Sequence, residues 1–297
     1  MNYALQLEQT LIKLSIPFYA ILILTEIIVS NYQHKKYYSI KETLMNAVLT
    51  VFNGGIDLLF RGVYVLILLW FYEHKLVSIQ NPYWYWFALF FFQELAFYTL
   101  HYVDHYCRFF WAAHVTHHSS EYFNITAGFR SSVFQPLYRF IYFIPLAAAG
   151  FEPADIILMY AMTQLYGVCV HTKYKISYGW LSYIFVDPSH HRVHHGSNVE
   201  YLDKNMGMCL IIFDRLFGTY QDELEEVPVT YGTTQVIEDK SILNTIFHEY
   251  KAIVRDFRAA PDLLTGLKYV FFAPGWSHDG HTLTSNQLRK QKESGKA

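Results

Sequence analysis

The chain alternates between long apolar runs and shorter polar stretches in which histidines gather. Residues 11–30 and 44–72 are long enough to cross a membrane as helices, and residues 83–100 form a third such segment. Two shorter apolar arms, 137–150 and 154–170, predict a hairpin that dips into the membrane and returns. The pattern therefore predicts an all-α fold, an integral-membrane helical bundle.

Polar residues refine this picture. Asp57, Arg61 and Glu94 interrupt the apolar segments, and charges in such positions usually face the interior of a bundle. Beyond residue 173 the composition is mixed, and after residue 240 the chain is expected to be soluble or to lie on the membrane surface. The tail from Ser285 is predicted to be disordered.

Loop charges predict the orientation. Lys35, Lys36 and Lys41 follow the first segment, whereas the next loop carries only Lys75, so the first loop is expected to be cytoplasmic. The N-terminus lacks the features of a cleaved signal peptide, so the first helix is expected to be retained. We therefore predict a multi-pass protein with its polar, histidine-bearing cap on the cytoplasmic side. The host membrane would be the plasma membrane in a bacterium or the endoplasmic reticulum in a eukaryote.

Composition agrees with a membrane protein and argues against a nucleic-acid-binding or disulfide-rich protein. Hydrophobic residues make up 53% of the 297 residues and aromatic residues 19%, whereas charged residues make up only 16%. The net charge of −2, without a basic stripe, argues against a nucleic-acid partner. Cys107, Cys169 and Cys209 stand singly, so neither a disulfide framework nor a thiolate metal site is predicted.

Nine histidines fall into metal-ligand spacings: one HxxxH, two HxxHH motifs and a single histidine between them. On a helix, residues three or four apart share a face, so each motif can chelate. Nine imidazoles exceed the four ligands of one zinc, which indicates two metals, and a site beside lipid favours redox iron. The predicted ligands are His101, His105, His114, His117, His118, His171, His191, His194 and His195.

The remaining histidines are treated separately. His190 precedes the second HxxHH by one residue, and its role is left open. The five that lie outside the spacing pattern are excluded from the site: His34, His74, His248, His278 and His281.

Competing classes can be compared with this pattern. Soluble di-iron carboxylate proteins need Glu-x-x-His pairs, and the chain has none. The chain also lacks a glycine-rich dinucleotide loop, so electrons are expected from an external reductant or an electron-transfer protein. A membrane metal carrier would space its ligands along several spans, whereas these cluster near the segment ends. A scaffold with structural zinc is the remaining non-enzymatic alternative.

The motif order resembles the fatty acid hydroxylase and sterol desaturase superfamily, and within it the alkylglycerol monooxygenases. The resemblance rests on residues 111–121 (WAAHVTHHSSE), 171–172 (HT), 188–196 (PSHHRVHHG), 203–205 (DKN), 213–219 (FDRLFGT) and 274–276 (PGW). It covers roughly residues 95–280 and divides the chain into three parts. These are N-terminal membrane helices (1–82), a fatty acid hydroxylase-type catalytic domain (83–236), and a cytoplasmic or interfacial segment and tail (237–297).

The resemblance implies a di-iron monooxygenase that hydroxylates a lipid C–H bond with dioxygen and cleaves ether lipids. A sterol or fatty-acyl hydroxylase or desaturase is the alternative. It also implies tetrahydrobiopterin or another external electron donor, although Tyr106 stands where the alkylglycerol enzymes have glutamate directly after HxxxH. No catalytic residue beyond the metal ligands, and no residue for the cofactor or the substrate, is assigned. Acceptors that could orient the imidazoles are Asp104, Glu121, Asp187 and Asp214, with a solvated Asp104 and a loop-capping Asp214 as alternatives.

Overall fold

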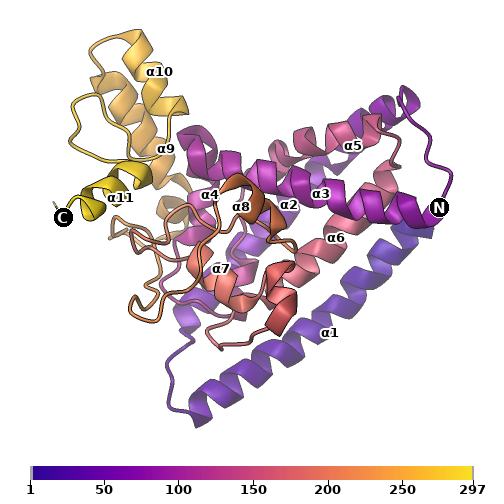
Figure 1. Cartoon of the computed structure of the whole chain (residues 1–297), viewed down its shortest axis with the longest axis horizontal. Coiled ribbons are helices and arrows are strands. Elements are labelled where there is room, and N and C mark those ends of the chain that lie inside the picture. Colours follow the sequence, from indigo (N-terminus) through magenta and orange to yellow (C-terminus); the bar gives the residue numbers. More distant parts are fainter. Residues whose placement is uncertain (1–2, 296–297) are drawn as a thin grey trace.

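The computed structural model describes residues 3–295, and the regular secondary structure in that range is helical. Its only β-type pairings there are two isolated bridges, Phe185 with Leu210 and Gly196 with Tyr231. The predicted all-α fold is therefore confirmed. Figure 1 shows long helices running toward one end of the molecule and a cap of short helices and loops at the other.

Two helices are long and apolar enough to cross a membrane: α1 (Tyr3–Tyr32) and α2 (Ile40–Glu73). Most of each apolar window is exposed, with large side chains such as Leu58, Leu59 and Leu66 on the surface. Such faces are stable in a lipid environment and unfavourable in water. The third predicted span, in α3 (Pro82–Tyr106), is long enough but less apolar.

Helix α3 continues beyond the predicted boundary at residue 100 and thereby carries His101 and His105 in regular helix. Asn81 caps its start, and Cys107, in an extended conformation, separates it from α4 (Arg108–His118). A large apolar core lies where α3 meets α2, α5 and α6. The core fixes α3, and with it the first two histidines.

The predicted hairpin is present, but its two arms differ. The first arm consists of short 3-10 helices, η2 (Gln135–Leu137) and η3 (Arg139–Phe143), followed by α5 (Ile144–Ala148). The second arm is a regular helix, α6 (Pro153–Cys169), which packs along α1. Another 3-10 helix, η1 (Ile125–Phe129), joins α4 to this region.

The charged residues inside the apolar segments find partners within the bundle. Asp57 pairs with Arg139, and Arg61 pairs with Glu8 of α1. Glu94 is 1% exposed and accepts hydrogen bonds from the backbone N–H groups of Cys209 (2.7 Å) and Leu210 (2.9 Å). Glu94 thereby ties α3 to the loop that follows the second HxxHH.

The cap contains η4 (Gly179–Tyr183), α7 (Pro188–His194) and α8 (Ile212–Phe217). Beyond it lie α9 (Ile242–Ala259), α10 (Leu263–Phe271) and α11 (Ser285–Glu293). The prediction of a disordered tail from Ser285 is wrong for α11. Its start has a capping box formed by Thr284 and Gln287, and Arg289 donates a hydrogen bond to the carbonyl of Leu202.

Candidate metal centre

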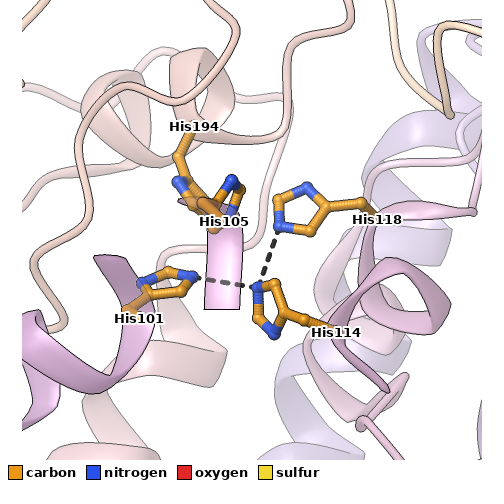
Figure 2. Close-up of side chains that lie close together, drawn as sticks. All are labelled: His101, His105, His114, His118 and His194. Atoms are coloured by element: carbon orange, nitrogen blue, oxygen red, sulfur yellow. Dashed lines mark hydrogen bonds between the residues drawn. The ribbon is translucent and has the colours of Figure 1, made fainter. Parts of the chain in front are cut away.

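The nine predicted ligands lie in two adjoining groups, and within each group the candidate ligand atoms are all within 4.8 Å of one another. The five-histidine group comprises His101, His105, His114, His118 and His194, and Figure 2 shows its rings turned toward a common centre. The four-histidine group comprises His117, His171, His191 and His195. Ligands 2.0–2.1 Å from a common metal would be separated by about 3–4 Å, so both groups have the dimensions of a metal site.

Helix geometry explains how the motifs divide between the groups. In the first HxxHH, on α4, His114 and His118 are four residues apart and both enter the five-histidine group, while His117 enters the other. In the second, on α7, His191 and His195 share the four-histidine group and His194 crosses over. Each motif thus supplies two imidazoles to one group and one to its neighbour. Helices α4 and α7 therefore each contribute ligands to both groups.

Ring contacts show how close the groups are. The Nε2 of His114 lies 3.0 Å from that of His101 and 3.1 Å from that of His118. In the four-histidine group the Nε2 atoms of His171 and His191 are 2.9 Å apart. Across the boundary, the rings of His118 and His195 stack with centroids 4.5 Å apart. Imidazole rings of the two groups are therefore in direct contact.

Backbone carbonyls hold several of these rings by the outer nitrogen. Nδ1 of His101 lies 2.7 Å from the carbonyl oxygen of Met206, and Nδ1 of His194 lies 2.9 Å from that of Lys204. The same pattern recurs in His117 with Arg130 (2.9 Å) and in His171 with Gly167 (2.7 Å). A carbonyl only accepts, so Nδ1 carries the proton and Nε2 presents its lone pair to the centre.

The loop 203–206 supplies two of those carbonyls and is itself firmly held. Asp203 and Asn205 have positive φ values of 53° and 55°, a region that Asp and Asn tolerate better than most residues. Asn205 is fully buried and donates to the carbonyls of His190 and Gln221. Asp214 accepts from the backbone N–H of Met206 at 2.6 Å, which is the loop-capping role left open for it by the sequence.

Asp203 is a site residue that the sequence motifs did not single out. Its Oδ1 lies 3.0 Å from Nδ1 of His105, and Ser285 of α11 donates a hydrogen bond to its other oxygen. A carboxylate that accepts from a ligand histidine fixes the ring and makes it a stronger ligand. The only available signal was its position in the DKN run quoted above.

The other proposed acceptors have different positions. Asp104 is completely buried, so the solvated alternative is wrong, and its Oδ2 lies 3.6 Å from Nδ1 of His114 while Gln135 and Tyr138 donate to it. Glu121 pairs with Lys240 at the surface and does not touch the rings. Asp187 caps the start of α7.

Two further residues receive structural roles. His190 belongs to neither group, because its side chain completes the capping box of α7 with Asp187. Tyr106, in the position of the family's glutamate, stacks on Tyr102 with ring centroids 4.2 Å apart.

Burial keeps the imidazoles neutral. It lowers the pKa of His117 to about 4 and that of His171 to about 3, and it also holds the pKa values of His194 and His195 well below the usual range. In the described part of the chain, the buried Nε2 atoms of His105, His194 and His195 have no hydrogen-bond partner. A metal cation bound to these lone pairs would remove this unfavourable feature, so the residues fit two metal ions.

Comparisons with known proteins agree with the motif analysis. Residues 86–219 match the fatty acid hydroxylase family. The chain is 32% identical to the human alkylglycerol monooxygenase over 274 residues, which is 89% of this chain and 60% of that protein. The zebrafish alkylglycerol monooxygenase is 34% identical over 71% of this chain and 47% of its own length.

A more distant relative is the ornithine lipid hydroxylase OlsE of Rhizobium tropici, 28% identical over 48% of this chain and 43% of that protein. No solved structure matches the chain. The chain spans 60% or less of the length of these relatives. Residues 86–219 thus match a fatty acid hydroxylase model, and the chain as a whole is similar to the alkylglycerol monooxygenases.

Proposed function

We propose that this protein is a membrane-bound monooxygenase that uses dioxygen to hydroxylate a C–H bond of a lipid, with one iron ion in each histidine group. The observation that carries the proposal is the pair of adjoining all-histidine groups built from shared helices. The similarity to alkylglycerol monooxygenases supports an ether lipid as substrate. Hydroxylation of the carbon bonded to the ether oxygen gives a hemiacetal, which collapses to an aldehyde and an alcohol.

The donor set supports iron. Imidazole binds iron, zinc, copper and nickel, but five nitrogens around one centre exceed the tetrahedral set that structural zinc prefers. Two irons would supply the redox chemistry that activates dioxygen, with electrons from tetrahydrobiopterin or another external donor.

The protein's own residues orient and insulate the centre. The carbonyls of Met206, Lys204, Arg130 and Gly167 select the tautomer that directs Nε2 inward. Eight of the nine rings are buried, and His117 is partly exposed. Limited access of water reduces side reactions of a reactive oxidant.

A second substrate class has its own support. The similarity to an ornithine lipid hydroxylase favours hydroxylation of an acyl chain, in which the alcohol persists as the product. The same superfamily includes sterol and fatty-acyl hydroxylases and desaturases. A substrate panel separates these reactions, because an aldehyde arises only from an ether.

The deciding experiment measures dioxygen consumption by the purified protein in nanodiscs. The protein is loaded with iron, supplied with tetrahydrobiopterin or another reductant, and offered alkylglycerols, acyl lipids and sterols in turn. We expect lipid-dependent uptake with one oxygen atom of ¹⁸O₂ in the product. Stoichiometric zinc, without uptake under any reductant, would instead support a structural zinc site.

Variants test the ligand assignment. His117→Ala and His194→Ala each remove one ligand from a different group, and turnover should be lost while the protein still inserts into membranes. His281→Ala is the matched control, because that side chain is 60% exposed and lies outside both groups. Full activity in either ligand variant would contradict the assignment.

We also propose that the histidine centre faces the cytoplasm, because Lys35 and Lys36 lie in the loop between α1 and α2 at that end, and Lys41 lies in the first turn of α2. A cysteine introduced at position 36 should react with an impermeant maleimide only after the membrane is opened. Labelling of intact cells would reverse this orientation.

A further inference from the structure

A slot of about 300 Å³ lies outside the histidine centre, between α1, α2, α6 and η3. Its wall along α6 extends from Ile156 to Val168, which is about 18 Å at the helical rise of 1.5 Å per residue. Most of this wall is apolar, including Ile157, Leu165 and Val168. The length and lining suit one hydrocarbon chain.

Four charged residues, which form two ion pairs, interrupt the apolar lining. Glu8 pairs with Arg61, and Asp57 pairs with Arg139, so the charges of the two pairs cancel. Tyr160 also lies on this wall, with its ring 4.8 Å from the Arg139 guanidinium. Charged groups within membrane helices are costly and usually mark a binding site or a pathway.

The charge balance indicates what polar group fits. Both arginines already have a carboxylate partner, so the slot offers no net positive charge to an anion. Each guanidinium nevertheless has five N–H donors, and Arg61 makes a hydrogen bond to Glu8 alone among the described residues. Spare donors beside carboxylate acceptors suit an uncharged oxygen-bearing group such as a hydroxyl or an ester.

Few polar contacts close the slot on the side between α1 and α2. Within the part of the chain described, the Glu8–Arg61 pair is the only hydrogen bond or ion pair that joins α1 to α2. Both helices are long and apolar enough to span a membrane, and α1 packs mainly along α6. A lipid chain could therefore enter sideways between α1 and α2.

At Gly128, the slot lies next to His171 of the four-histidine group. Gly128 lines the slot, and a Cβ at this position would lie only 3.0 Å from Nδ1 of His171. No histidine lines the slot itself, so an occupant would be separated from the metal ligands by Gly128 and Val168. The slot and the metal centre are therefore adjacent but distinct.

We propose that this slot is a lipid-binding site that takes one hydrocarbon chain and the uncharged polar group of a neutral glycerolipid, admitted laterally between α1 and α2. This inference rests on the membrane helices and the slot lining and does not require the proposed reaction.

The test uses the full-length protein in phosphatidylcholine nanodiscs that contain a diazirine-bearing monoacylglycerol. After photolysis, mass spectrometry should locate the probe on peptides of α1, α2 and α6, and unlabelled monoacylglycerol should compete with it. A diazirine-bearing phosphatidic acid serves as the anionic comparison and should label the slot about tenfold less.

Ala161→Trp would fill the slot, whereas the adjacent Met162→Trp changes a side chain that is 49% exposed on the outer face of α6. We expect about a tenfold loss of slot labelling in the first variant, equivalent to about 1.4 kcal/mol, and none in the second. A second pair of variants on α1 covers the case that the tryptophan variant does not fold. Ser15→Phe fills the slot, and Leu14→Phe changes an exposed side chain beside it and is the control.

Each outcome bears on the proposal. Equal labelling of a folded slot-filling variant and its control would overturn the site, and preferential labelling by phosphatidic acid would overturn the assigned lipid class. Iron content and dioxygen uptake, measured on the same samples, report separately on the proposed reaction. Failure of one proposal is therefore distinguishable from failure of the other.

Discussion

The two histidine groups differ in the acceptors that contact the outer nitrogens of their rings. In the five-histidine group, Asp203 contacts Nδ1 of His105 at 3.0 Å, and buried Asp104 lies 3.6 Å from His114. In the four-histidine group, His117 and His171 contact only backbone carbonyls through Nδ1. A metal cation in the five-histidine group would therefore have carboxyl groups nearby, whereas one in the four-histidine group would be held by neutral imidazoles alone.

This difference predicts unequal affinities. A carboxylate near a metal ligand strengthens the ligand and offsets the charge of the ion, so the five-histidine group should hold its metal more tightly. The weaker site, which adjoins the slot, should exchange first.

Ligand removal should give the largest effect. His194→Ala should weaken the metal of the five-histidine group, and His191→Ala that of the four-histidine group, each by at least about 100-fold, because loss of an outer partner alone costs 10–100-fold. Metal content after dialysis measures this. His190→Ala is the matched control on the same helix, and an equal metal loss in that variant would contradict the grouping.

Acid should destabilise the metal-free four-histidine group. The folded-state pKa values of His117 (about 4) and His171 (about 3) lie below the unfolded value near 6.5, so the unfolded chain binds protons first as the pH falls. Stability of the metal-free protein is therefore complete above pH 6.5 and is lost progressively toward pH 3. Thermal unfolding after chelation, measured at each pH, checks this, and a melting temperature independent of pH would refute neutral burial.

Asp203→Asn should have a smaller and selective effect. The change preserves the shape of the side chain but removes its charge, so affinity in the five-histidine group should fall 10–100-fold while the other group is unchanged. Asp222→Asn, also a loop carboxylate but outside both groups, is the control. Competition with a metal-sensitive dye measures the affinities, and equal weakening of both groups would remove the proposed asymmetry.

Ser285→Ala should have the smallest effect. It removes the hydrogen bond from α11 to Asp203 while leaving the carboxylate in place. A few-fold loss of affinity is expected, because the carboxylate that contacts His105 remains and only one hydrogen bond that supports it is lost. The same dye assay would detect it, and a loss as large as that of Asp203→Asn would mean that α11 has a larger role in holding the loop.

The sequence predicted the features that depend on local spacing. HxxxH and HxxHH identify side chains on one helical turn, and the apolar runs locate the long helices. The division into five and four was not predicted, because it depends on how α3, α4 and α7 are packed. The contact of Asp203 with His105 joins residues 98 positions apart, which no local pattern reveals.

The error at α11 has a different origin. Its polar composition suggested disorder, but Thr284 and Gln287 form a capping box whose Thr-x-x-Gln spacing was visible in the sequence. The capping-box spacing is a more specific signal for the start of a helix than polar composition is for disorder. The contact of Arg289 with Leu202, which helps to hold the helix in place, could be seen only in the folded chain.

The most direct test of the account is the metal content of the iron-loaded protein during stepwise chelation. We predict two irons per chain that leave in two phases, with the faster phase missing in His191→Ala and the slower phase missing in His194→Ala. A single metal per chain, or two that leave together in every variant, would contradict two distinct sites.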